Sequence, residues 1–147
     1  MGETAELVGQ RFTAAEPYEV SRAKVREFAA ALGESSPLSF DVDAARAAGH
    51  ADLVAPPTFA VIPAFTGLRE VMTRVGAPLQ QQVHGEQGFT HHRAIVAGDV
   101  LTTTATAQRI RAVAGNLFVT VSCEVADAAG EPVTTARSVV VVRGAGS

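Results

Sequence analysis

The segment LVAPPTFAVIPAFTGLREVMTRVG, residues 53–76, constrains the fold of this chain more than any other. Its first half is apolar on nearly every side of a helix, and a helix of that kind requires burial. Pro57 suits a first helical turn, where its missing N–H costs nothing, and Gly76 predicts an end near Val75. Pro63 lies within the first two turns and is expected to bend the helix.

From Gln82 onward the apolar residues recur with a period of two, which predicts strands. Short turns separate the predicted strands, so the sheet is expected to be antiparallel. The strands are VHGEQGFTHHRAI, LTTTATAQRIRAV, LFVTVSCEVAD and VTTARSVVVV. A sheet with one apolar face can curl around a hydrophobic helix and bury both. The prediction is an α+β fold of the hot-dog type, with a long central helix wrapped by an antiparallel sheet, as one domain over residues 1–147.

The residues before the central helix predict smaller elements. PYEVS is expected to form a short strand. Ser21 suits the N-cap of a helix over Arg22–Leu32, which Gly33 ends. Asp41 suits the N-cap of a second short helix, through VDAARAA.

Composition and charge exclude several functions. Apolar residues make up 47% of the 147 residues, which indicates a folded chain. The net charge is −3 and Lys24 is the only lysine, so no basic stripe points to nucleic acid or to a membrane surface. No apolar run reaches membrane-spanning length, and the N-terminus does not resemble a signal peptide, so a cytoplasmic location is expected. Cys123 is the only cysteine and is expected to be a buried, inert thiol.

Three segments carry a resemblance to a known family: LGESSPLSF (residues 32–40), VAPPTF and HGEQGFTHHRAIVAGDVL. They resemble the loop, the start of the central helix and the first long strand of the (R)-specific hydratases and dehydratases in the MaoC-like hot-dog superfamily. The nearest group is the single-hot-dog one that includes the A-type subunit of the 3-hydroxyacyl-acyl-carrier-protein dehydratase of mycolic acid elongation. The resemblance implies a dimer of hot dogs and reversible hydration of an acyl thioester on coenzyme A or an acyl-carrier protein, with no cofactor.

Active members of that family use a loop that reads G-D-x-N-P-x-H, in which Asp and His transfer the protons. Here Glu34 stands at the Asp position, Ser36 at the Asn position and Ser39 at the His position. Serine is not a base near neutral pH unless another base activates it. Pro57 replaces a glycine whose N–H stabilises the thioester enolate in the family, and proline has no N–H to donate. The loop is therefore expected to keep its fold and to have lost its chemistry.

The resemblance implies that acyl-chain contacts come from Pro57, Thr58, Phe59 and Phe65 at the start of the central helix. His84, His91 and His92 are the possible replacements for the missing base. Strand alternation predicts that His84 and His92 share one face of the sheet and that His91 lies on the other. No Cys, Asp or Glu completes a metal site with them, so no metal is expected. Gly88 is expected to mark a bulge or a close backbone approach, and Asp99 a turn.

Three functions remain open. The first is a subunit of a 3-hydroxyacyl-thioester dehydratase that binds the acyl chain and pairs with a catalytic hot-dog subunit. The second is an independent homodimer that acts as a weak hydratase or thioesterase on acyl-CoA. Many hot-dog thioesterases carry an acid or Gln on the central helix, and here the helix has no acid before Glu70. The third is a binding module without turnover.

Overall fold

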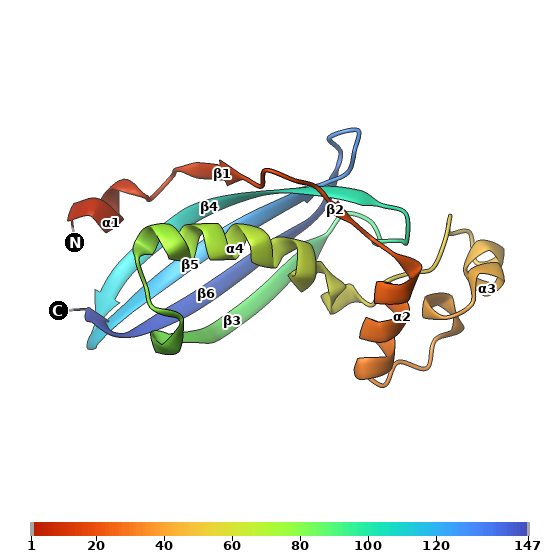
Figure 1. Ribbon diagram of the computed structural model, residues 1–147, viewed down its shortest axis with the longest axis horizontal. Helices are drawn as coiled ribbons and strands as arrows, with labels where there is room; N and C mark the ends of the chain where they lie inside the picture. Colours follow the sequence, from red (N-terminus) through yellow and green to blue (C-terminus); the bar gives the residue numbers. More distant parts are fainter. Residues whose placement is uncertain (1, 147) are drawn as a thin grey trace.

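The computed structural model describes residues 2–146 and contains one long helix packed on one face of an antiparallel sheet (Figure 1). The strands are β1 (Arg11–Thr13), β2 (Tyr18–Glu19), β3 (Gln82–His91), β4 (Val100–Val113), β5 (Gly115–Ala126) and β6 (Pro132–Gly146). The sheet order is β1-β4-β5-β6-β3, with β2 also paired to β4. Every pairing between these strands is antiparallel, as predicted. Strand β3 therefore lies at one edge of the sheet.

The helical elements precede β3. They are α1 (Gly2–Glu6), α2 (Arg22–Ala31), η1 (Pro37–Ser39), α3 (Val42–Ala47), η2 (Pro57–Ala60), α4 (Val61–Val75) and η3 (Leu79–Gln81). The two predicted caps are confirmed. The side chain of Ser21 accepts the N–H of Lys24, and Asp41 accepts the N–H groups of Asp43 and Ala44. Helices α2 and α3 lie beyond the N-terminal end of α4, while both chain termini lie at the opposite end (Figure 1).

The central helix begins as one 3-10 turn, η2, and becomes α-helical at Val61. Pro63 is the third residue of α4, within the first α-turn. It is tolerated there because the N–H groups of the first turn have no i→i−4 partner to lose. The helix ends at Gly76, which adopts a left-handed conformation with φ 72°. In this position glycine pays no steric penalty.

Helix α4 is buried on one side only, which differs from the prediction. Pro63, Ala64, Gly67, Leu68, Val71 and Met72 are buried. The opposite side, which includes Phe65 and Arg69, is exposed. The sheet covers one face of α4. The opposite face of the apolar first half of α4 is therefore exposed to solvent.

The core divides into two clusters. One lies under α4 and includes Val71, Val119 and Val142. The other lies where α2 and η2 meet the start of β4, and includes Val25, Phe59 and Leu101. Phe89 of β3 packs against both clusters. Cys123 is 1% exposed, and its thiol donates to the carbonyl of Ala64 at 3.4 Å. Burial raises the pKa of this thiol to about 12.

Two short elements near the N-terminus were not predicted, α1 and β1. Strand β1 pairs with β4, and its Phe12 ring lies 4.3 Å from the Arg74 guanidinium of α4. This N-terminal segment therefore runs beside the outer part of the central helix (Figure 1).

Candidate functional site

The Glu34 side chain binds backbone groups of its own loop. Its Oε1 accepts the backbone N–H of Ser35 at 2.8 Å and that of Ser36 at 2.9 Å. These bonds satisfy two donors that follow the end of α2. The carboxylate therefore holds the turn between α2 and η1.

The two serines of the loop also have structural partners. Ser36 caps η1, because its hydroxyl accepts the N–H of Leu38 at 3.4 Å. Ser39 is 4% exposed and its hydroxyl donates to the carbonyl of Val54 at 2.7 Å. In this structure the hydroxyl therefore donates to a backbone carbonyl, whereas nucleophilic catalysis would require it to donate to a base.

The start of the central helix presents Pro57 and Thr58 to solvent and buries Phe59 completely. The ring of Phe59 is packed by Phe28, at a centroid distance of 5.4 Å, and by Tyr18, at 6.3 Å. Pro57 offers no N–H at this point of the turn. That Pro57, Thr58 and Phe59 contact a substrate stays a prediction. Of these three residues, Pro57 and Thr58 are exposed and could touch a substrate, whereas Phe59 is buried.

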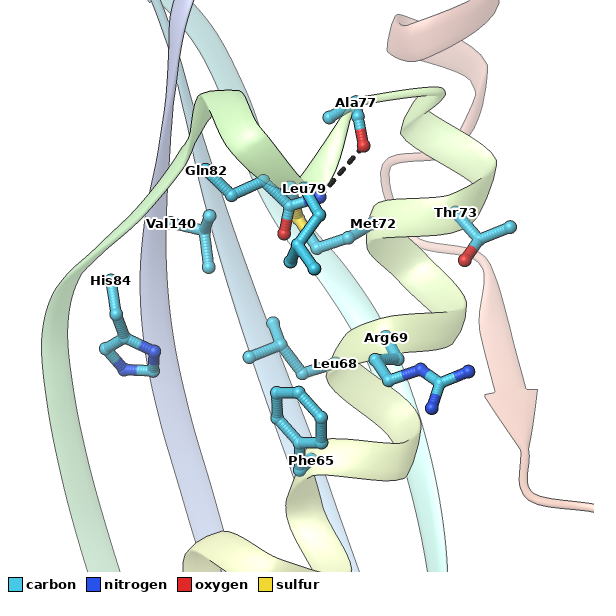
Figure 2. A pocket seen from close by; sticks show the side chains of 10 residues that line it. All are labelled: Phe65, Leu68, Arg69, Met72, Thr73, Ala77, Leu79, Gln82, His84 and Val140. Atoms are coloured by element: carbon cyan, nitrogen blue, oxygen red, sulfur yellow. Dashed lines mark hydrogen bonds between the residues drawn. The ribbon is translucent and has the colours of Figure 1, made fainter.

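A cavity of about 530 Å³ lies between α4 and the β3 edge of the sheet (Figure 2). Its volume is within the range of small-molecule sites. The lining residues are Phe65, Leu68, Arg69, Met72, Thr73, Ala77, Leu79, Gln82, His84 and Val140. Phe65 is 49% exposed and Leu79 is 74% exposed, so this apolar surface is open at the sheet edge. Of the four residues expected to contact an acyl chain, Phe65 is the one that lines this cavity.

The predicted faces of the histidines are wrong because β3 contains a bulge. The bulge lies between His84 and Glu86, at Gly85, and the predicted site Gly88 shows regular pairing. The extra residue reverses the alternation, so His84 and His91 share the face that packs against α4. His92 lies on the other side, in a hollow lined mainly by residues of β4, β5 and β6.

His91 has local partners rather than a place in a catalytic set. Its Nδ1 lies 3.0 Å from the hydroxyl of Thr134, and its ring stacks on Phe89 at a centroid distance of 5.6 Å. Among residues 2–146, no group of three or more His, Cys, Asp or Glu side chains lies close enough together to hold a metal ion. No helix in that range is long and apolar enough to cross a membrane.

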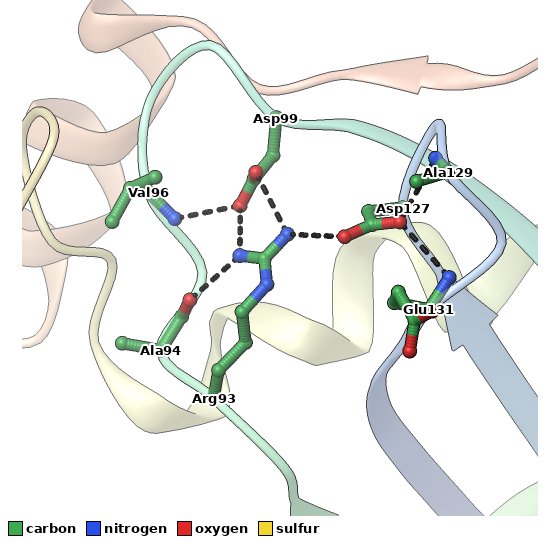
Figure 3. Close-up of polar contacts among 7 residues, drawn as sticks. All are labelled: Arg93, Ala94, Val96, Asp99, Asp127, Ala129 and Glu131. Carbon is green, nitrogen blue, oxygen red and sulfur yellow. Dashed lines mark hydrogen bonds and ion pairs between the residues drawn. The ribbon is translucent and has the colours of Figure 1, made fainter.

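Arg93 organises a polar cluster that was not predicted from the sequence (Figure 3). Its guanidinium binds both carboxylate oxygens of Asp99, at 2.8 and 3.0 Å, and reaches Asp127 at 3.4 Å. Asp99 also accepts the N–H of Val96, so it closes the turn before β4 as expected. The backbone N–H of Glu131 and other donors hold the pKa of Asp127 below its ordinary value. The cluster joins the β3–β4 turn to the β5–β6 turn.

The comparisons with known proteins agree with this architecture. Residues 6–136 match the family described as FAS1-like, dehydratase domain region. A UPF0336 protein of Leifsonia xyli subsp. xyli is 46% identical over 140 residues, which are 94% of each chain. A UPF0336 protein of Clavibacter michiganensis subsp. michiganensis is 46% identical over 141 residues, 95% of each chain.

Two solved structures show the same fold. A MaoC-like dehydratase superposes with a TM-score of 0.87 and 37% identity, over 97% of this chain and 44% of that chain. This chain thus spans less than half of that protein. The HadBC (3R-hydroxyacyl-ACP dehydratase) complex of Mycobacterium tuberculosis superposes with a TM-score of 0.81 and 26% identity, over 92% of this chain and 96% of that chain. With a helix-on-sheet architecture of the MaoC-like hot-dog type and a family match over most of its length, the chain belongs to the FAS1-like dehydratase domain family.

Proposed function

We propose that this chain is the acyl-binding, non-catalytic subunit of a 3-hydroxyacyl-thioester dehydratase. In this role it pairs with a hot-dog subunit that supplies the general base. The observation that carries the proposal is Ser39. The resemblance matches Ser39 to the position where active members carry His. Ser39 is 4% exposed, and its hydroxyl donates a hydrogen bond to the carbonyl of Val54.

The loss of a general base typically costs ~10²–10⁴ in rate. The loss of an oxyanion donor, which Pro57 cannot replace, costs ~10²–10³. The two effects need not multiply, but either alone leaves a poor enzyme. The Glu34 carboxylate is held by its own loop, because its Oε1 accepts two N–H groups there, and this supports a structural role.

The surface around β3 supports a partner subunit. Strand β3 lies at the edge of the sheet and leaves backbone groups unpaired on one side. Phe65, Leu79 and Val83, three of the most exposed large apolar residues, lie on α4, η3 and β3 near that edge. A second hot dog that paired with β3 would cover them and would close the cavity between α4 and the sheet.

The similar structures support the same arrangement. HadBC is a complex by its printed description, and more than half of the MaoC-like dehydratase chain lies outside the match to this chain. A catalytic hot dog encoded in the same genome, with an intact G-D-x-N-P-x-H loop, is the proposed partner. The substrate is an acyl thioester of coenzyme A or of an acyl-carrier protein.

Thioesterase activity of a homodimer is the weaker alternative. The acid on α4, Glu70, binds Arg74 at 2.8 Å on the exposed side of the helix and does not line the cavity. Among residues 2–146, no carboxylate lines this cavity, where one would be needed to activate water beside a thioester.

The test is hydration of trans-2-octenoyl-CoA, followed by the loss of enoyl absorbance. We expect negligible turnover by this chain alone, and turnover together with a stable heteromer when the catalytic hot dog is co-expressed. Ordinary enzymatic rates for the chain alone, abolished by Glu34→Gln, would show that the loop is catalytic. If no complex forms and the other hot dog is equally active alone on short and long chains, the subunit role is wrong.

A further inference from the structure

The bulge in β3 turns His84 into the cavity. His84 pairs with Val140 of β6 and Glu86 pairs with Val139, so Gly85 is the extra residue. His84 therefore shares a face with Val140, which belongs to the core under α4. A Cβ on Gly85 would lie 3.3 Å from the carbonyl oxygen of Val139, so a glycine fits this close approach.

The part of α4 opposite His84 carries two large apolar side chains. Figure 2 shows its ring on the sheet side of the cavity, with Leu68 and Phe65 of α4 opposite. Apolar side chains cannot hydrogen-bond an imidazole, and the His84 ring has no hydrogen bond to any described residue. The imidazole has one donor and one acceptor nitrogen when it is neutral.

The other polar groups of the cavity lie on α4 or already bind the protein. The side-chain amide nitrogen of Gln82 donates to the carbonyl of Ala77 at 2.8 Å (Figure 2). Arg69 and Thr73 are exposed on α4, at the rim. On the sheet wall, His84 is thus the polar side chain with no hydrogen bond to another described residue, whereas Gln82 has its amide nitrogen engaged.

We propose that His84 is a specificity-determining residue of the acyl cavity. Its ring hydrogen-bonds the hydroxyl of a 3-hydroxyacyl chain, so the cavity prefers that chain to the unsubstituted chain of the same length. The inference rests on the proposed acyl-binding function and deepens it. A hydroxyl that enters an apolar cavity without a partner pays its desolvation cost in full, and His84 offsets that cost. A site that hydrogen-bonds a ligand hydroxyl discriminates against the analogue that lacks it.

The test measures binding of (R)-3-hydroxyoctanoyl-CoA and octanoyl-CoA to the full chain by titration calorimetry. One hydrogen bond corresponds to a preference of about 2- to 12-fold for the hydroxy ligand. His84→Leu is expected to remove the preference and to bind octanoyl-CoA at least as tightly as the wild type. His84→Gln keeps a donor and an acceptor and is expected to restore part of the preference.

His92→Leu is the matched control, because His92 lies on the opposite face just after β3 and outside this cavity. It is expected to leave the preference unchanged. A second readout is the long-range ¹H–¹⁵N spectrum of the imidazoles. The His84 nitrogens are expected to shift more with the hydroxy ligand than with octanoyl-CoA.

The outcomes separate two failures. Equal binding of both ligands by the wild type, or an unchanged preference in His84→Leu, overturns the role of His84 and leaves acyl binding intact. Binding of neither ligand, both alone and in the presence of the catalytic hot dog, overturns the proposed acyl-binding function itself. His84 is exposed, so its variants are expected to fold, and circular dichroism checks this.

Discussion

The hydroxyl of Ser39 donates a 2.7 Å hydrogen bond to the carbonyl oxygen of Val54, and this bond joins the loop after α2 to the segment before η2. The amide of Val54 in turn donates to the carbonyl of Leu38 at 2.9 Å. The two segments that would carry the chemistry in an active relative are thus fastened together by a structural contact. Ser39, which the sequence resemblance places at the position of the family's histidine, is one of the residues that hold these two segments together.

Ser39→Ala is expected to destabilise the fold by about 1–3 kcal/mol, because it leaves the partly buried Val54 carbonyl without this donor. Hydration by the heteromer is expected to remain at the wild-type rate. Urea unfolding at pH 7 measures the first quantity and the enoyl assay the second. The control is Ser35→Ala, at an exposed position of the same loop, which is expected to change neither. Loss of turnover at unchanged stability would place Ser39 in the chemistry after all.

Gly67 marks the closest approach of α4 to the sheet. A Cβ on this residue would lie 2.8 Å from the Cβ of Ala105 and 3.0 Å from Cγ2 of Thr103. Gly67→Ala gains ~1 kcal/mol of helix propensity, but the overpacking it forces typically costs ~1–3 kcal/mol. The variant is therefore expected to be less stable in urea unfolding, by up to about 2 kcal/mol.

Gly88→Ala is the matched control for that change. It lies in β3 with a negative φ, and a Cβ there meets nothing within 4 Å. We expect it to be neutral or slightly stabilising, because alanine has fewer unfolded conformations to lose. A Gly67→Ala variant as stable as Gly88→Ala would mean that α4 and β4 can separate at no cost.

The long elements of the fold could be predicted because their signals are local. The period of two in β4 to β6 and the cap residues Ser21 and Asp41 each act over a few neighbours. The bulge could not be predicted in that way. Gly85 and Gly88 look alike in the sequence, and only pairing with Val139 and Val140 selects Gly85. A bulge at Gly85 puts His84 on the opposite face of the sheet from the one that strict alternation predicts. Alternation therefore could not predict that His84 lines the cavity.

Residue types alone predicted that the loop after α2 has lost its chemistry, and the structure adds which contacts its side chains make. The sequence places serine at the His position, whereas only the fold shows that the hydroxyl is buried and bonded. Arg93 was missed for a similar reason. Its two carboxylate partners lie 6 and 34 residues away, and only the second brings the β5–β6 turn into the cluster.

Arg93→Lys is expected to destabilise the fold by about 1–3 kcal/mol although the charge is kept. Arginine binds both oxygens of Asp99 through a planar fork, and the point charge of lysine cannot reproduce that geometry. Asp99→Asn is expected to have an effect of similar size, and the double variant less than the sum, since both remove one interaction. Urea unfolding of the four proteins forms the cycle, and additive losses would show that Arg93 and Asp99 act independently.

The ion pair between Arg22 and Asp52 predicts how the free energy of unfolding changes at low pH. Two nitrogens of Arg22 donate to the carboxylate, at 2.8 to 3.3 Å, and the N–H of Leu53 adds a third donor at 2.8 Å. The Arg22 hydrogen bonds, followed by that of Leu53, lower the pKa of Asp52 from 3.8 to about 2. A carboxylate with a lowered pKa contributes stability that is fully present above its unfolded value and is lost as the pH falls through the folded value.

The difference in unfolding free energy between the wild type and Asp52→Asn is therefore expected to be constant from pH 7 to about pH 5. It is expected to shrink between about pH 4 and pH 2, where the wild type takes up a proton on unfolding and the variant does not. Urea unfolding at pH 7, 5, 4, 3 and 2.5 measures this. Glu16→Gln, at an exposed position, controls for the loss of one negative charge. A difference that stays constant down to pH 2.5 would mean that Asp52 ionises alike in the folded and unfolded chains, and that the contacts with Arg22 and Leu53 do not hold its charge.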